Sequence, residues 1–189
     1  MSLKPWKLLS TKDVSPSRWF PIEERSYELP DGQIVDDFTI TTLADVSMIV
    51  PITAEGMIVM VRQFKPGINQ IITQFPAGRL DPGEKSMELL ALRELEEEAG
   101  IRATDSQLHF VAKMSGFSTK ASEVVYVYVV DQCIVNSKQS LDVTEEIEVK
   151  IYSPEEVDSC ITEGDILSAD AIAAWALTKK KYAHLLKIT

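Results

Sequence analysis

Three glutamates, Glu94, Glu97 and Glu98, lie at positions i, i+3 and i+4 of one short stretch. In an α-helix, which turns about 100° per residue, their side chains would project within roughly 100° of one another. Carboxylates that face a protein interior repel each other and lose hydration, so the arrangement is costly unless a cation lies among them. Hard divalent ions such as Mg²⁺ take oxygen ligands. The spacing therefore points to a metal site, and the alternative is a solvated acidic helix face.

The segment that carries these acids, Lys85–Ile101, has the composition of an α-helix. Leu, Ala, Met and Glu all favour that state, and Gly100 is placed to end it. The apolar residues on the same side as the acids, one to two turns earlier, are Met87, Leu90 and Ala91. The side of the helix that ends in the three carboxylates must therefore begin by facing protein. A turn-rich loop, Pro76–Glu84, leads into this helix.

The rest of the chain predicts strands and two further helices. Residues 1 to about 45 alternate aromatic and charged side chains around the turn signal Pro30-Asp31-Gly32, which predicts a β-hairpin or small meander. Further strands are expected at residues 46–52, 57–64, 71–75, 108–114, 123–130 and 147–152. Ser153 and Pro154 are typical of a helix start, and a last helix is predicted over about 168–186. The pattern indicates a mixed α/β protein with helices packed on a mixed sheet.

Composition narrows the class of partner. The chain has 189 residues, enough for one domain with an appendage, and a formal net charge of −10. This charge disfavours a nucleic-acid backbone or an anionic membrane as partner. Cys133 and Cys160 have no CxxC spacing, so neither a disulfide framework nor a zinc site is indicated. The absence of a long apolar run or a targeting pattern leads us to expect a soluble, cytoplasmic protein.

The loop and helix together resemble the signature of the Nudix hydrolases, enzymes that cleave a nucleoside diphosphate linked to another moiety. The resemblance lies in Gly78, then Glu84 after five residues, then the run Arg93-Glu94-Leu95-x-Glu97-Glu98-x-Gly100-Ile101. One spacing differs, because eight residues separate Glu84 from Arg93 where the family usually has one fewer. A strict count would place Lys85 at the position of that first glutamate.

Within this family the chain resembles the ADP-ribose pyrophosphatase branch. The likeness includes Trp19–Gly32, Val61–Pro66 with Phe75–Gly78, Glu145–Val149 and Glu163–Ile166. It implies an α/β/α sandwich with a mixed sheet plus an N-terminal antiparallel β segment. It also implies a division into an N-terminal β segment, residues 1–45, and a hydrolase domain, residues 46–189. The N-terminal segment would cross to a partner in a homodimer.

The resemblance implies a role for the acid cluster. Glu94, Glu97 and Glu98, with the backbone carbonyl of Ala77, would hold Mg²⁺ or Mn²⁺. Arg93 would pair with a signature glutamate and orient it. An ordinary i,i+4 ion pair between Arg93 and Glu97 is equally consistent with helix geometry.

Other positions that match the branch would complete the site. Glu145 or Glu146, in a loop before a strand, is the candidate general base, and the alternative is a solvated loop acid. The residues expected to contact substrate are Trp19, Arg62, Gln63 and Lys65, with Trp19 stacking on the nucleobase. The basic residues could instead be surface charges, and Trp19 could be an interface anchor.

The expected reaction is metal-assisted hydrolysis of a pyrophosphate bond, and ADP-ribose would give AMP and ribose 5-phosphate. Many ADP-ribose hydrolases have a proline downstream of the signature, whereas the matching stretch Lys113–Ser118 has none. GDP-mannose and other nucleotide sugars therefore stay open as substrates. A module that binds nucleotides without turnover is the alternative from a different functional class.

Overall fold

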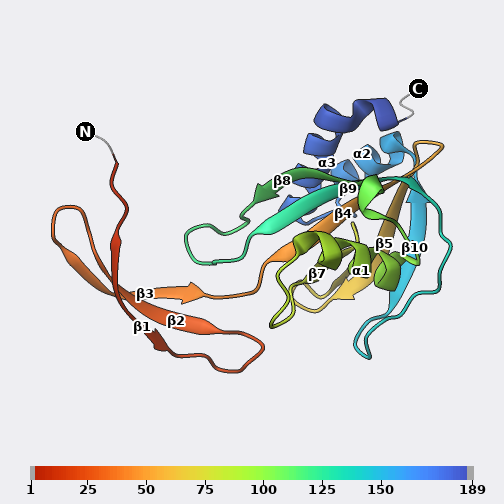
Figure 1. The fold of residues 1–189 in the computed structure, drawn as a ribbon. Helices are drawn as coiled ribbons and strands as arrows, with labels where there is room; N and C mark the ends of the chain where they lie inside the picture. Colours follow the sequence, from red (N-terminus) through yellow and green to blue (C-terminus); the bar gives the residue numbers. More distant parts are fainter. Residues whose placement is uncertain (1–2, 187–189) are drawn as a thin grey trace. The chain divides into compact units, whose positions relative to one another are not determined.

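The computed structural model describes residues 3–186, which form two compact units. The N-terminal unit contains the chain up to Asp45 together with the loop Ser115–Glu123. The main unit contains Val46–Met114 and the chain from Val124 onward. Figure 1 shows the elements of both units.

The N-terminal unit is a three-stranded antiparallel sheet in the order β1-β2-β3, with bounds Lys7–Asp13, Ile22–Glu28 and Ile34–Thr41. The predicted turn at Pro30-Asp31-Gly32 joins β2 to β3, and Gly32 has a positive φ of 88°, which glycine adopts without steric cost. Trp6, Tyr27 and Phe38 form a cluster on this sheet, with ring centroids 5.8 Å apart in each pair. The loop 115–123 joins the unit through the end of β3, where Thr41 donates its N–H to the carbonyl of Lys120 over 2.8 Å.

The main unit is built on a mixed sheet with strand order β10-β5-β4-β9-β8. The bounds of these strands are β4 Val46–Thr53, β5 Ile58–Lys65, β8 Leu108–Met114, β9 Val125–Cys133 and β10 Ile147–Tyr152. β4 and β9 run parallel, and the other neighbouring pairs are antiparallel. β4 lies in the middle of the sheet, and its residues 47–52 are all buried, which accounts for its uninterrupted apolar sequence.

Helices cover both faces of this sheet and enclose two hydrophobic clusters (Figure 1). Helix α1, Met87–Ala99, packs on one face through the predicted apolar residues Met87, Leu90 and Ala91. Helices α2, Pro154–Glu163, and α3, Ala169–Tyr182, contribute to the cluster on the other face, where Trp175 is buried. Short 3₁₀ turns lie at Asp105–Gln107 and Ala183–Leu185. This arrangement confirms the predicted α/β/α sandwich.

Local sequence explains where the helices begin and end. Ser86 caps α1 by accepting the N–H of Leu89 over 3.2 Å, and Gly100 ends the helix with a left-handed φ of 66°. Ser153 and Glu156 form a capping box at the start of α2. None of the helices in the described part of the chain is long and apolar enough to cross a membrane.

The loop before α1 contains a short strand that the sequence did not predict. β7, Ala77–Arg79, pairs antiparallel with the first residues of β4, while β6, Gln70–Gln74, pairs with β5. The register pairs of β4 and β5 include only Ile52 and Ile58, at their shared hairpin. The two strands diverge beyond that point, so β6 and β7 take up the backbone groups that the divergence leaves unpaired.

Candidate active site

The C-terminal half of α1 presses two glutamates against the backbone of β7. Glu98 has 3% of its surface exposed and accepts the backbone N–H of Ala77 at Oε2 over 2.9 Å. Glu94, one turn earlier, has 8% exposed. The helix therefore buries two of the three carboxylates, on the inward face that the spacing of the acids predicted.

Gly78 makes this approach possible. A Cβ atom at this position would lie 2.0 Å from the carboxyl carbon of Glu94 and 2.2 Å from one of its oxygens. Contacts that short do not occur, so any side chain at position 78 would displace the carboxylate. The glycine of the signature loop is therefore required for the position of Glu94 rather than for an unusual φ.

Burial changes the protonation of both acids. Desolvation raises the pKa of Glu98 to about 8, and it does so despite the hydrogen bond from Ala77, which acts in the opposite direction. Desolvation likewise raises the pKa of Glu94 to about 7, against the attraction of Arg93. The carboxylate of Glu145 adds to both increases. The site thus disfavours its own negative charge, which a divalent cation would stabilise.

Arg93 forms ion pairs with four surrounding acids. Its guanidinium lies 3.1 Å from Glu94 and 3.2 Å from Glu97, and the second of these is the i,i+4 pair. It also lies 3.4 Å from both Asp81 and Glu84. Both roles expected for Arg93 are therefore compatible with its contacts. Glu84 reaches Arg93 although eight residues separate the two.

The third acid of the cluster is less buried than the other two. Glu97 is half-buried and its carboxylate faces Arg93. Among residues 3–186, no group of three or more His, Cys, Asp or Glu side chains has the arrangement of a metal site. The same nitrogen of Arg93 pairs with Glu94 and with Glu97, so Glu97 stays on the cleft side of α1 although it is more exposed than Glu94 and Glu98. The donor set nevertheless fits a hard cation, since every candidate ligand is an oxygen atom.

A cleft of about 320 Å³ opens beside these acids. The residues that line it are Ala77, Gly78, Arg79, Asp81, Arg93, Glu94, Glu97, Ser140, Asp142 and Glu145. Of the two acids proposed as general base, Glu145 is in this set and Glu146 lines a separate pocket. The signature loop supplies Arg79 and Asp81, to which the sequence analysis gave no role. Ser140 and Asp142 come from an irregular loop that carries no recognisable motif.

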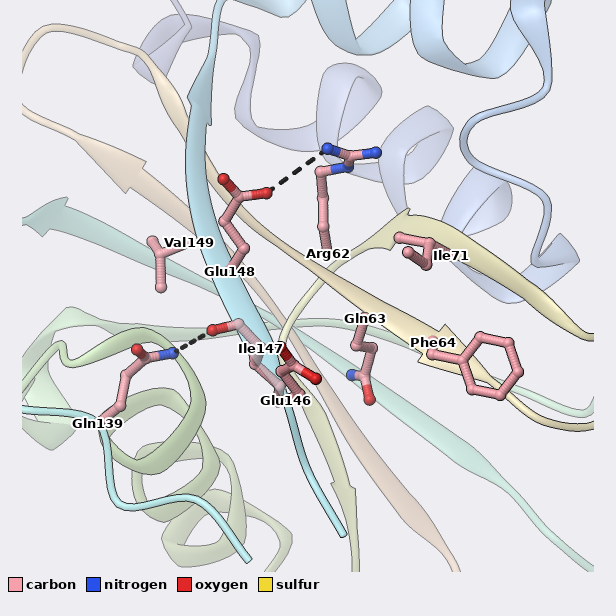
Figure 2. A pocket seen from close by; sticks show the side chains of 9 residues that line it. All are labelled: Arg62, Gln63, Phe64, Ile71, Gln139, Glu146, Ile147, Glu148 and Val149. Atoms are coloured by element: carbon pink, nitrogen blue, oxygen red, sulfur yellow. Dashed lines mark hydrogen bonds and ion pairs between the residues drawn. The ribbon is translucent and has the colours of Figure 1, made fainter.

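The separate pocket, here called the side pocket, has a volume of about 630 Å³ and is shown in Figure 2. Its lining residues are Arg62, Gln63, Phe64, Ile71, Gln139, Glu146, Ile147, Glu148 and Val149. Arg62 is paired with Glu148 over 3.5 Å, as Figure 2 shows. Gln63 is buried, and its Nε2 atom has no hydrogen-bond partner. Two of the predicted substrate-binding residues therefore lie in the side pocket rather than in the acid cleft.

Lys65, at the end of β5, is the predicted phosphate-binding residue that interacts with the acids. Burial lowers the pKa of Lys65, while the carboxylates of Glu98 and Glu145 act in the opposite direction. Its positive charge therefore acts on both Glu98 and Glu145.

Trp19 belongs to the N-terminal unit, in a tight turn between Ser17 and Phe20. It has 77% of its surface exposed, and the guanidinium of Arg18 lies 4.4 Å from its ring centroid. Within its own unit the ring is therefore available to a partner or a ligand.

Comparison with known proteins shows what the whole chain is similar to. The NUDIX domain family model matches residues 42–174. The chain is 29% identical over 175 residues to the ADP-ribose pyrophosphatase of Bacillus subtilis (strain 168), covering 90% of each chain. It is 35% identical over 129 residues to the ADP compounds hydrolase NudE of Escherichia coli (strain K12), covering 66% of this chain and 67% of that protein. A crystal structure of an ADP compounds hydrolase superposes with a TM-score of 0.84 at 24% identity, covering 100% of both chains.

Proposed function

This chain belongs to the Nudix family, and on that premise we propose that it hydrolyses the pyrophosphate bond of ADP-linked compounds, with ADP-ribose as the leading substrate. The names of the relatives, an ADP-ribose pyrophosphatase and an ADP compounds hydrolase, support this substrate class. Water adds across the P–O–P linkage, so that one phosphorus gains the water oxygen and the other phosphate leaves with the bridging oxygen. From ADP-ribose the products are AMP and ribose 5-phosphate.

One observation carries the proposal, namely the burial of Glu94 and Glu98 against Ala77 and Gly78. A helix that only needed a polar surface would expose its acids, because burying a carboxylate without a compensating charge or hydrogen bonds costs on the order of several kcal/mol. A binding module without turnover would have no reason to retain this arrangement.

The residues that would hold a divalent ion, Mg²⁺ or Mn²⁺, are Glu94, Glu97 and Glu98 with the carbonyl oxygen of Ala77. When bound, such an ion neutralises the phosphate oxygens and lowers the pKa of a water molecule. Arg93 holds Glu94 and Glu97 on the cleft side of α1.

Glu145 is the residue that we assign as general base. It lines the acid cleft, and its charge acts on both Glu94 and Glu98. A carboxylate in this position can accept the proton of the attacking water. Lys65, whose charge acts on Glu98 and Glu145, would stabilise the charge of the leaving phosphate.

The remaining predicted contacts concern the rest of the substrate. Arg62 and Gln63 line the side pocket. Consecutive residues line the two pockets at two places in the chain: residues 139 and 146 line the side pocket, and residues 140 and 145 line the acid cleft. This adjacency supports a role for the side pocket in holding a part of the substrate away from the diphosphate. Trp19, exposed in its own unit, would stack on the nucleobase.

A substrate panel tests the proposal. The protein is incubated with Mg²⁺ and either ADP-ribose or GDP-mannose, and the nucleoside monophosphate released is measured. Release of AMP from ADP-ribose with the higher kcat/KM supports the proposed substrate. Preferred release of GMP would assign the chain to nucleotide-sugar hydrolysis instead. Binding of both compounds without release of either would contradict the enzymatic assignment.

We also propose that the N-terminal unit pairs two copies of the chain in a homodimer. All seven residues of β1 are exposed, and all seven of β2 are only half-buried. Apolar side chains are among the exposed ones: Leu8 and Leu9 of β1 are 48% and 43% exposed, and Ile34 of β3 is 47% exposed. A three-stranded sheet of this kind gains stability by packing against another surface. Light scattering during size-exclusion chromatography should give twice the chain mass of 21.1 kDa, and a monomer at micromolar concentration would contradict the dimer.

A further inference from the structure

The loop between β9 and β10 is fastened to the last turn of α1 through backbone hydrogen bonds. Ser140 donates its N–H to the carbonyl of Glu97 over 3.0 Å. Asn136 and Ser137 donate theirs to the carbonyl of Gly100 over 3.0 and 2.9 Å. These bonds satisfy carbonyls that the end of a helix leaves without partners. The loop therefore follows the acidic helix closely before it enters β10.

Gln139 adds the side-chain contact that joins the two elements. Its Nε2 atom donates to the carbonyl of Glu98 over 2.6 Å and to the carbonyl of Ile147 over 3.3 Å. Figure 2 shows the second of these bonds. Glu98 is the most buried acid of the site, and Ile147 is the first residue of β10. One amide group thus connects the end of the acidic helix to the start of a strand.

Glu145 lies inside the segment that this amide closes. It is two residues before Ile147, and its N–H donates to the carbonyl of Asp142 over 2.9 Å. Its own carboxylate accepts the N–H of Asp142 over 3.0 Å. Ile147 itself is held in the sheet by its pairing with Gln63 of β5, so the two bonds of Gln139 link this end of the turn to the end of α1. Without the bonds of Gln139 the turn would open more often, and Glu145 would then move away from Glu94 and Glu98.

We propose that Gln139 is a positioning residue for the hydrolysis, because it fixes the turn that carries Glu145 relative to the acids of α1. This inference rests on the proposed function. Gln139 lines the side pocket but not the acid cleft, so its effect on the reaction at the diphosphate acts through Glu145. Small displacements of a reacting group reduce turnover strongly while they leave binding almost unchanged.

The test replaces Gln139 with methionine, which has a similar length and no N–H donor. We expect kcat for ADP-ribose to fall about tenfold or more, as for other residues that orient a catalytic group. The affinity for Mn²⁺, measured by titration, should stay within about twofold, because the ligands on α1 are unchanged. The N–H of Glu145 should exchange with deuterium about tenfold faster, since its turn opens more often.

Gln107→Met is the matched control. Gln107 also donates through Nε2 to a backbone carbonyl, that of Asp131, over 3.0 Å, and it lines neither pocket of the site. Its kcat should equal that of the parent. Because Gln139 is exposed, its replacement should leave the fold intact. Should Gln139→Met prove too unstable to purify, Gln139→Asn, which draws the amide back by one methylene, is held to the same criteria.

Parent-like kcat and exchange in Gln139→Met would overturn the inference, as would an equal loss of kcat in both variants. A parent protein that releases no nucleoside monophosphate from any ADP-linked compound would overturn the proposed function instead. Exchange at Glu145 would then still decide whether Gln139 holds this turn.

Discussion

Ala77 donates its backbone N–H to the carboxylate of Glu98 over 2.9 Å. This bond joins the signature loop to the acidic helix, and it is the direct contact between the chain segment that would supply a carbonyl ligand and the most buried acid. The bond does not offset desolvation, because the pKa of Glu98 remains raised to about 8. The site is therefore arranged to favour a positive charge that the protein supplies only in part, through Lys65 and Arg93.

The raised pKa values predict how stability depends on pH in the absence of divalent ions. Glu98 has a folded pKa of about 8 against an ordinary value of 4.5, so the folded state binds more protons than the unfolded state between these values. Stability must then decrease as the pH rises from about 5 to 8, by about 3 kcal/mol to an order of magnitude. Glu94, with a pKa of about 7, acts in the same direction. Urea denaturation in the presence of a chelator measures the effect.

Glu98→Gln is the comparison for this measurement, since a neutral amide removes the titration and keeps the size of the side chain. Its stability should change less over the same pH range. Mn²⁺ added at pH 8 should stabilise the parent and have a smaller effect on the variant, because a ligand stabilises the state that binds it. A parent protein equally stable at pH 5 and pH 8 would show that Glu98 ionises normally.

Gly78→Ala should retain the fold and lose activity. The new Cβ would overlap the carboxylate of Glu94, which lies at the flexible end of its side chain and can turn away. Turnover should fall about 100-fold because a metal ligand is displaced, with little change in the melting temperature. Gly67→Ala is the control, since a Cβ there meets no atom within 4 Å. Parent-like turnover in Gly78→Ala would mean that the position of Glu94 is unimportant.

The two adjacent acids before β10 should behave differently. Glu145 lines the acid cleft and Glu146 lines the side pocket. Glu145→Gln should reduce kcat about 100-fold or more, as expected for the loss of a general base. Glu146→Gln should stay within about threefold of the parent in kcat. The reverse order would move the base to Glu146.

Arg93→Gln should destabilise the protein even where no substrate is involved. Arg93 lies within 3.4 Å of Asp81 and Glu84 and closer still to Glu94 and Glu97. Removing it leaves their repulsion uncompensated, and we expect a loss of about 2 kcal/mol in the free energy of unfolding. Arg102, exposed and paired with Glu96 over 2.6 Å, provides a matched control, since an exposed ion pair contributes little to stability. Equal losses in Arg93→Gln and Arg102→Gln would contradict the central position of Arg93.

Much of the fold follows from local patterns in the sequence. The apolar residues of α1 and its end at Gly100 were predictable from helical spacing and from the conformational freedom of glycine. The predicted bounds of β8 and β10 coincide with those observed. β7 was not predictable, because it forms only where β4 and β5 diverge. Its three residues carry a turn-like sequence, and their extended form is determined by a strand distant in the chain.

The site shows the same division. Helical spacing placed Glu94 and Glu98 on an inward face, and the structure buries both. Helical spacing could not predict that Glu97 is more exposed than Glu94 and Glu98, because the contacts of Arg93 depend on where the loop with Asp81 and Glu84 lies. It also left the choice between Glu145 and Glu146 open, since adjacent residues point to different pockets only once the loop is folded. Gln139 carries no motif, and its contacts are visible only in three dimensions.

The central claim is that the buried acids hold the metal, and it is tested most directly by Mn²⁺ titration of the parent and of Glu98→Gln, followed by ADP-ribose turnover at saturating Mg²⁺. Glu96→Gln is the control, because Glu96 pairs with Arg102 away from the cleft. We predict that Glu98→Gln remains folded, binds Mn²⁺ at least about tenfold more weakly and releases almost no AMP, while Glu96→Gln matches the parent. Turnover by Glu98→Gln near the parent rate would contradict the assignment of the buried acids as the metal site.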